Sequence, residues 1–291
     1  TDEGDLDAKL TTLDPNFAAG IVELLVKMNL QKGDTVAVLL TGSMPGANIA
    51  VLAAAKTLGL VVKSITSVGA SQWGANNADF TWLDMEEILY SNGFIDQKSV
   101  AASIGGRNDM GRLLSPEGRK IILENITNHK IPIIKNNKLA ENIEQRMAIF
   151  SSFLDIQKYS AMINVGGGVA SLGTSFNSKL LKAGIVNRSD VLDISLREGG
   201  IEGVLSKFSM KNIPVLHVLN IKSLIEKLNM PFAPIPIPEI GIGGLYAERT
   251  YNTKIAGICL FIVSGCVFMV GYQSKKRIKE HLTDHEPDSL L

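Results

Sequence analysis

The first 254 residues of the chain contain no cysteine. Both cysteines, Cys259 and Cys266, lie in one apolar run near the C-terminal end. Disulfides and cysteine-ligated metal sites are therefore excluded from the rest of the sequence. Exported bacterial domains also commonly lack disulfides, so this absence does not decide the compartment.

The chain also lacks an excess of charge of either sign. Lysine and arginine total 29, aspartate and glutamate total 29, and the formal net charge is zero. No long basic run occurs before Lys275. We therefore expect no nucleic-acid partner, because such proteins usually show a basic patch or stripe.

Familiar catalytic and cofactor motifs are missing as well. No G-x-x-x-x-G-K-[ST] sequence is present, and Ser171 stands where the last glycine of G-x-G-x-x-G would follow Gly166 and Gly168. Ser43 lacks the G-x-S-x-G context of a nucleophile elbow. Of four histidines, His217 lies on a predicted strand, where a core role is favoured. The sequence predicts no cofactor and no metal site.

What the chain does have is a long apolar run. Residues 255–272 carry no charge, and Lys275, Lys276, Arg277 and Lys279 follow closely. Eighteen helical residues are just long enough to cross a hydrocarbon core of about 30 Å. We predict a transmembrane helix over 255–272, with a buried core helix as the alternative.

The flanking charges predict the orientation of this helix. Basic residues tend to stay on the cytoplasmic side, so residues 273–291 should be cytoplasmic and the preceding domain extracytoplasmic. Export of that domain would need a signal, and none is visible after Thr1. We expect a signal anchor to precede the sequence.

Residues 1–230 show alternating helix and strand patterns, which predict an α/β class. Asp14-Pro15 suits a helix start, and Phe17–Leu30 carries apolar residues at helical spacing. Strands separated by helices imply a single parallel-sheet, Rossmann-like three-layer domain. The expected strands are Thr35–Leu40, Val61–Val68, Lys98–Ile104, Ile131–Ile134, Ala161–Val165 and Ile213–Leu219, with helices between them and a mostly helical stretch at Ser189–Phe208.

Residues 231–254 differ in composition from the domain before them. Prolines recur at 231, 234, 236 and 238, and glycines follow at 241, 243 and 244. This composition is typical of an extended tether to the membrane.

Small and polar residues follow four of the predicted strands. The segments are 41–48, 69–76, 103–109 and 164–171. Ligands of open parallel sheets bind beyond the carboxyl ends of the strands, so these loops predict a shared cleft for a carboxylate or phosphate. For any single loop, a tight turn that needs positive φ is the more common explanation.

Sixteen residues form the candidate ligand site. They are Gly42, Ser43, Gly69, Ser71, Gln72, Trp73, Asn76, Asp84, Arg107, Asp109, Arg112, Asn164, Gly166, Gly167, Gly168 and Ser171. Arg107 or Arg112 could hold a ligand carboxylate bidentately, although both could instead pair with Asp109 or a surface acid. Glu86, near Asp84, is expected on a solvated helix face.

Several segments resemble the bacterial poly-γ-glutamate system protein family. The resemblance rests on Ser67–Asn76 and Phe80–Glu86, with further blocks at Leu114–Arg119 and Ile163–Ser171. Shorter matches are Asn16–Ala19, Gly42-Ser43, Asn48–Ala53 and His217–Ile221. The resemblance implies a membrane-anchored accessory protein of poly-γ-glutamate biosynthesis or export, with the polymer or its membrane synthase complex as partner. It implies no catalytic residues.

Two functional hypotheses follow. The first is a non-catalytic accessory that binds the polymer or the synthase. The second is an enzyme acting on γ-glutamyl amide bonds, with a hydroxyl from Ser43 or Ser71 and a carboxylate from Asp84 or Asp109. The absence of a recognisable base near either serine favours the first.

Overall fold

The computed structural model describes residues 3–111, 114–191, 202–247 and 252–283. The chain divides into two compact units, Thr1–Ala247 and Glu248–Leu291. Each unit is described by itself.

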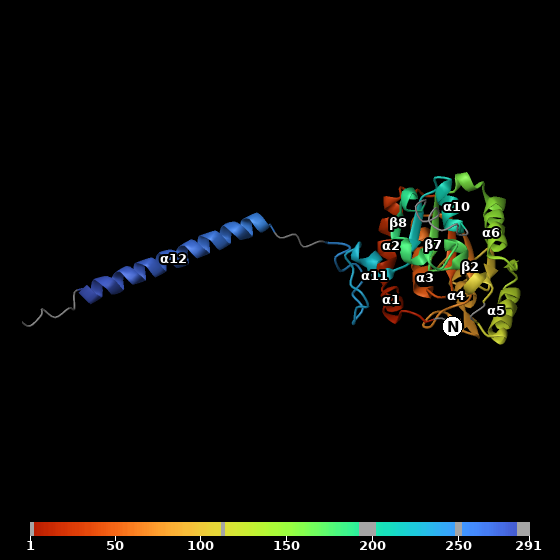
Figure 1. Ribbon diagram of the computed structural model, residues 1–291, viewed down its shortest axis with the longest axis horizontal. Helices are drawn as coiled ribbons and strands as arrows, with labels where there is room; N and C mark the ends of the chain where they lie inside the picture. Colours follow the sequence, from red (N-terminus) through yellow and green to blue (C-terminus); the bar gives the residue numbers. More distant parts are fainter. Residues whose placement is uncertain (1–2, 112–113, 192–201, 248–251, 284–291) are drawn as a thin grey trace, which may run out of the picture. The chain divides into compact units, whose positions relative to one another are not determined.

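The first unit is built on a seven-stranded sheet in the order β6-β5-β2-β1-β7-β9-β8 (Figure 1). Six strands are parallel, and β8 pairs with β9 in the antiparallel direction. The strands are β1 (Thr35–Thr41), β2 (Val61–Ser67), β5 (Ala101–Ser103), β6 (Ile133–Ile134), β7 (Ala161–Val165), β8 (Gly184–Val186) and β9 (Val215–Val218). A separate small hairpin joins β3 (Asn76–Asn77) to β4 (Phe80–Thr81).

Helices cover both faces of this sheet. One face packs against α1 (Leu6–Thr11), α2 (Pro15–Lys27), α3 (Pro45–Thr57), α4 (Trp82–Ser91), α5 (Pro116–Asn128) and α11 (Ile221–Glu226). The other packs against α6 (Leu139–Phe153), α7 (Val169–Leu172) and α10 (Val204–Met210). The short elements η1 (Arg107–Asp109), η2 (Ile156–Lys158) and α8 (Asn177–Leu180) complete the unit. The predicted three-layer α/β architecture is confirmed.

Strand β1 shows why both faces need cover. Val36, Val38 and Leu40 belong to one apolar cluster, and Ala37 and Leu39 belong to the other. Successive side chains of a strand point to opposite faces, so a continuous apolar run is buried on both sides. The central strand thereby ties the two halves of the core together.

The helix starts follow the sequence signals. The Asp14 side chain accepts a hydrogen bond from the Asn16 amide, and Pro15 occupies the first turn of α2. Thr81 and Asp84 form a reciprocal capping box at the start of α4. These contacts satisfy amides that have no partner within the helix.

The strand order creates a crevice between β1 and β7. From β1 the chain moves through β2 and β5 to β6, and then returns to the other side of β1 as β7. Open parallel sheets bind ligands at such a reversal point, outside the carboxyl ends of the strands. The topology therefore marks the loops after β1 and β7 before any side chain is considered.

Some expectations about single elements were wrong. Strand β8 was not predicted, and the third strand covers Ala101–Ser103 instead of the expected Lys98–Ile104. The expected helical stretch at 189–208 is a different case, because residues 192–201 lie outside the described residues and residues 189–191 are helical, as expected. Its described end contains α10, which begins at Val204.

The compact unit extends through most of the segment that was expected to be a tether. The Asn16 side chain donates to the Glu239 carbonyl (3.1 Å) and accepts from the Gly241 amide (2.9 Å) and the Tyr246 hydroxyl (2.9 Å). The Ala233 amide donates to Thr11 Oγ1 at 2.8 Å. Phe232 and Leu245 pack against the core. Residues 231–247 are therefore docked on the domain.

The second unit contains one long helix, α12 (Thr253–Thr283). Residues Thr253–Leu282 of this helix have a mean hydropathy of 2.3 over their most apolar window and are not buried within the protein. The helix is long and apolar enough to cross a membrane. It contains the predicted span at 255–272 and continues into the basic residues that follow.

Candidate functional site

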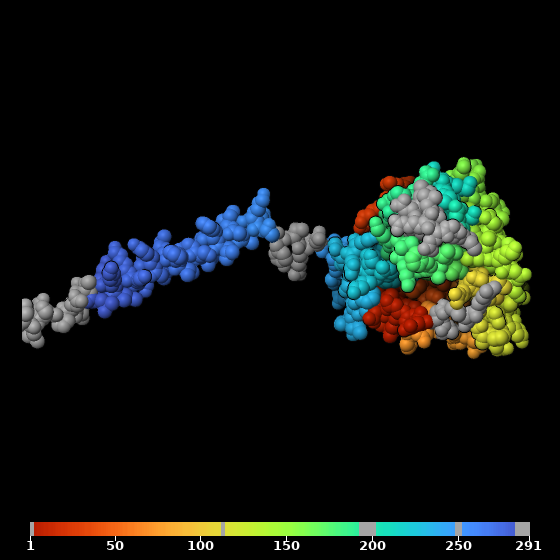
Figure 2. Space-filling model, viewed as in Figure 1, coloured from red at the N-terminus to blue at the C-terminus, as the bar shows by residue number. Residues whose placement is uncertain are grey.

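A cavity of about 670 Å³ opens at the carboxyl edge of the sheet. It is lined by the loops after β1, β2, β5, β7 and β9, together with the N-terminal segment around α1. Figure 2 shows a hollow here, between the red N-terminal residues and the green residues that follow β7. The expectation that four strand-end loops share one edge is confirmed. We call this cavity the cleft.

The β1 and β2 loops meet on one side of the cleft. Ser43 Oγ accepts a hydrogen bond from the Ser71 amide at 3.0 Å, and both serines line the cavity. Gly42 lies behind them. A side chain there would meet the Val68 carbonyl oxygen at 2.2 Å, so the close approach of the two loops requires glycine. Gly42 positions the wall and does not face the cavity.

The β7 loop forms the opposite wall through Gly166, Gly167 and Gly168. Gly166 has φ +84°, and a Cβ atom there would lie 2.3 Å from the Thr41 methyl group. The amides of Gly167 and Gly168 have no acceptor among the residues that the structure describes. Two backbone donors are thus left for a ligand in the wall of the cleft.

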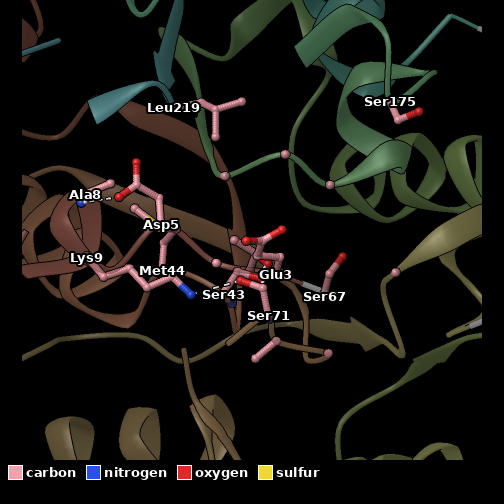
Figure 3. Close-up of a pocket in the computed structure, with 18 of the residues that line it drawn as sticks. Glu3, Asp5, Ala8, Lys9, Ser43, Met44, Ser67, Ser71, Ser175 and Leu219 are labelled. Carbon is pink, nitrogen blue, oxygen red and sulfur yellow. Dashed lines mark hydrogen bonds between the residues drawn. The ribbon is translucent and has the colours of Figure 1, made fainter. Parts of the chain in front are cut away.

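Lys9 of α1 enters the cleft from the N-terminal segment, as Figure 3 shows. Its amine donates to Ser71 Oγ at 2.9 Å and to the Gln72 carbonyl oxygen. Burial lowers the pKa of Lys9, and the nearby Asp5 carboxylate opposes this effect only in part. A buried amine with a lowered pKa, hydrogen-bonded to a serine, has functional potential.

Further charged groups surround this centre. Arg107 and Lys222 line the cleft, as do the acidic residues Glu3 and Asp5. Among the described residues, Arg107 has no carboxylate partner, and Lys222 has only the Phe232 ring, 5.9 Å from its amine. The cleft therefore presents two cations without a carboxylate partner among the described residues, together with two acidic residues.

The loop that carries Arg107 contains two residues in left-handed conformations and is held in place by a buried ion pair. Asn108 and Asp109 both adopt left-handed conformations, with φ of 57° and 60°. Arg146 of α6 donates to both oxygens of Asp109, at 2.7 and 3.0 Å, and Ser103 adds a third bond at 2.7 Å. Asp109 is therefore an anchor of the loop and does not line the cleft, because its oxygens are occupied inside the protein.

Asp84 lies away from the cleft. It caps α4 and accepts hydrogen bonds from Thr81, Asn125 and His129. Burial alone would raise the pKa of Asp84, but these hydrogen bonds outweigh it and lower the pKa below its ordinary value. The hypothesis that Asp84 or Asp109 serves as a base for the cleft serines does not fit this geometry.

Asn164 and Ser171 are buried behind the β7 loop. Asn164 donates to the Gly166 carbonyl at 2.8 Å and contacts His217 Nδ1 at 2.9 Å. Burial lowers the pKa of His217 to about 4, so this imidazole is neutral near pH 7. Asn164 shapes the turn at Gly166 from beneath and does not reach the cleft.

The remaining predicted residues divide as follows. Gln72 contributes only its carbonyl, to Lys9, while Trp73 and Asn76 are exposed and lie outside the cleft lining. Arg112 lies outside the described residues. Of the sixteen candidates, the cleft brings together Ser43, Gly69, Ser71, Arg107, Gly166, Gly167 and Gly168.

Sequence reasoning missed Lys9, Lys222 and Arg146. Lys9 and Lys222 belong to short helices whose pattern resembles an ordinary solvated face, and no local signal separates them from other lysines. Arg146 stands among apolar positions of α6, beside the buried Met147. A charge on the buried stripe of an amphipathic helix was a signal that could have identified it.

No family model, no curated protein and no solved structure matches the chain. Within the described residues, no group of three or more histidine, cysteine, aspartate or glutamate side chains could hold a metal ion.

Proposed function

We propose that this chain is a membrane-anchored accessory protein of poly-γ-glutamate biosynthesis or export whose cleft binds the polymer. One observation carries the proposal. Arg107, Lys222 and the amides of Gly167 and Gly168 surround one cavity without internal acceptors among the described residues. Such donors suit a carboxylate, and arginine suits it best because its fork of N–H groups matches both oxygens.

A γ-linked glutamyl chain offers the matching groups. Its amide backbone uses the side-chain carboxyl, so every residue keeps a free α-carboxylate, and the first residue also keeps an α-amino group. Glu3 and Asp5 lie in the same cleft as the cations and could accept that ammonium group. The mixed charge of the cleft thus favours the amino end of the polymer over a plain polyanion.

The sequence blocks at Ser67–Asn76 and Ile163–Ser171 support the pathway independently of this chemistry. They resemble the poly-γ-glutamate system family, and each block contributes residues to the cleft, Ser67 and Gly69–Ser71 from the first and Gly166–Val169 from the second. The long apolar helix α12 supports the anchor. The basic residues after the span favour an extracytoplasmic domain.

Calorimetry with defined ligands tests the proposal. We expect γ-linked glutamyl oligomers to bind the full chain in detergent micelles, and Arg107→Ala to weaken binding by roughly 1.5–3 kcal/mol. Lys120→Ala is the matched control, because Lys120 is 66% exposed on α5 and outside the cleft. No binding to the wild type, or equal losses in both variants, would refute the proposal.

The orientation has a test of its own. A protease added to intact spheroplasts should degrade the α/β unit and leave residues after 273 protected. Protection of the α/β unit, with cleavage of the tail, would reverse the proposed side.

A second function, hydrolysis or transfer at a γ-glutamyl amide, is favoured by one observation. Lys9 lies 2.9 Å from Ser71 Oγ, and its pKa is lowered, so it could serve as the base that the sequence did not reveal. Incubation with polymer should then shorten it or exchange its ends, and Ser71→Ala should abolish the change. If the polymer binds but its length and ends stay unchanged, the catalytic function is refuted and only the binding function remains.

A further inference from the structure

Four isoleucines near the end of the α/β unit face away from it. Ile235 is 90% exposed and Ile240 is 77% exposed, and Ile237 and Ile242 are more than half exposed. We call residues 235–242 the isoleucine loop; it projects from the unit close to α11 (Figure 1). A contiguous group of exposed, large apolar side chains usually marks an interaction site.

The isoleucine loop is exposed although its backbone is fixed. Asn16 is buried, and it bonds the loop at the Glu239 carbonyl and the Gly241 amide. On either side, Phe232 and Leu245 pack on the core. The loop is therefore held on the domain by its ends and its polar backbone, while its apolar side chains are presented to the outside.

The distance along the chain to α12 and the composition of residues 231–247 favour lipid as the partner of the isoleucine loop. Helix α12 begins at Thr253, eleven residues after Ile242. Even a fully extended chain of that length spans only about 40 Å, so a bilayer crossed by α12 lies within reach of the loop. Residues 231–247 carry a single charge, at Glu239, and include the half-exposed Tyr246 next to their last residue. Tyrosine is enriched where membranes meet water.

We propose that the isoleucine loop inserts into the interfacial region of the lipid bilayer that α12 crosses. This inference depends on the proposed membrane anchor, and on nothing proposed for the cleft. In addition to α12, the loop would attach the chain to the bilayer through apolar side chains that enter the boundary between headgroups and acyl chains.

Site-directed spin labelling of the full chain in phosphatidylcholine–phosphatidylglycerol vesicles tests the proposal. Both native cysteines are first replaced, as Cys259→Ala and Cys266→Ala, and single labels are placed through Ile235→Cys and Ile240→Cys. Phe94→Cys is the matched control, because Phe94 is 63% exposed on the same unit. A fourth protein keeps Cys266 and reports on the span itself.

We expect labels at 235 and 240 to be reached several-fold more readily by oxygen, relative to a water-soluble nickel chelate, than the label at 94. Equal accessibility at all three positions would overturn the proposal, because it would place the loop in water. Exclusion of both reagents would overturn it too, because a second copy or another protein would then cover the loop. The label at 266 separates these outcomes from failure of the anchor.

Discussion

Two arginines at the same edge of the sheet have opposite environments. The Arg146 guanidinium is 1% exposed and bonds both oxygens of Asp109, Ser103 Oγ and the Asn142 carbonyl. Arg107 lies two residues before Asp109, lines the cleft and has no carboxylate partner among the described residues. The hydrogen bonds of Arg146 are used within the fold, whereas Arg107 is available to a ligand in the cleft.

This contrast separates two kinds of polar group at the strand ends. Groups that stabilise the fold have their hydrogen bonds satisfied inside the protein, and removing one partner leaves a buried charge. Groups available to a ligand have unused donors and face the cavity. Stability measurements and binding measurements should therefore respond to different residues, even where these lie in one loop.

The largest expected effect on stability comes from Arg146→Met. The substitution leaves the Asp109 carboxylate buried without its cation, and we expect it to lower the free energy of unfolding by about 3–5 kcal/mol. Urea unfolding of the full chain in micelles, followed through the buried Trp82, measures this. Adding Asp109→Leu should recover part of the loss. A cost below about 1 kcal/mol would show that the pair does not anchor the loop.

Glu86 extends the comparison to a buried carboxyl group that does not line the cleft. It was expected on a solvated face, but it is 2% exposed and bonds the amide and hydroxyl of Ser99. Burial raises the pKa of Glu86 to about 7, although the bonds from Ser99 oppose this. The sequence placed Glu86 on the polar side of the helix, and only the packing of α4 against the sheet buries it.

The raised pKa of Glu86 predicts a pH dependence of stability. The folded state holds its proton more tightly than the unfolded state, so stability should fall as pH rises from about 4.5 to about 7. A shift of this size corresponds to a loss on the order of 3 kcal/mol. Unfolding of Glu86→Gln should lack this decline. Glu87, whose side chain is 40% exposed, provides the control. The hydrogen bond from Lys98 lowers the pKa of Glu87, so Glu87→Gln should keep the decline between about pH 4.5 and 7.

Asp84 should affect stability moderately and binding not at all. Asp84→Ala removes half of the capping box of α4, and loss of such a cap usually costs about 1 kcal/mol. Because Asp84 lies outside the cleft, we expect the affinity for γ-glutamyl oligomers to stay unchanged in calorimetry. A loss of affinity in a folded variant would return Asp84 to the candidate site.

Much of the fold could be predicted from the sequence, because buried parallel strands and capped helices leave local patterns. Strand β1 was expected at Thr35–Leu40 and ends one residue later. Strand β8 has only three residues, Gly184–Val186, and its antiparallel pairing with β9 depends on tertiary contacts. The tether pattern of residues 231–247 was misleading, because proline-rich composition does not reveal the bonds made by Asn16.

The candidate site was predictable only in part, for a related reason. Glycines and serines after strands indicated the walls of the cleft, since topology brings strand ends to one edge. Whether a polar residue there faces the cavity depends on a partner distant in sequence. Asp109 is occupied by Arg146, 37 residues away, and Ser71 is contacted by Lys9, 62 residues away.

The smallest expected effect on stability is the one that most sharpens the comparison. Arg107→Ala should change the free energy of unfolding by less than about 0.5 kcal/mol, because a side chain without internal partners leaves nothing unsatisfied when it is removed. The same substitution is expected to weaken ligand binding. Arg146→Met, in contrast, should act mainly by lowering the free energy of unfolding. If Arg107→Ala instead destabilised the protein as strongly as Arg146→Met, Arg107 would belong to the structural group. The cleft would then retain Lys222 and the amides of Gly167 and Gly168 as its donors for a carboxylate.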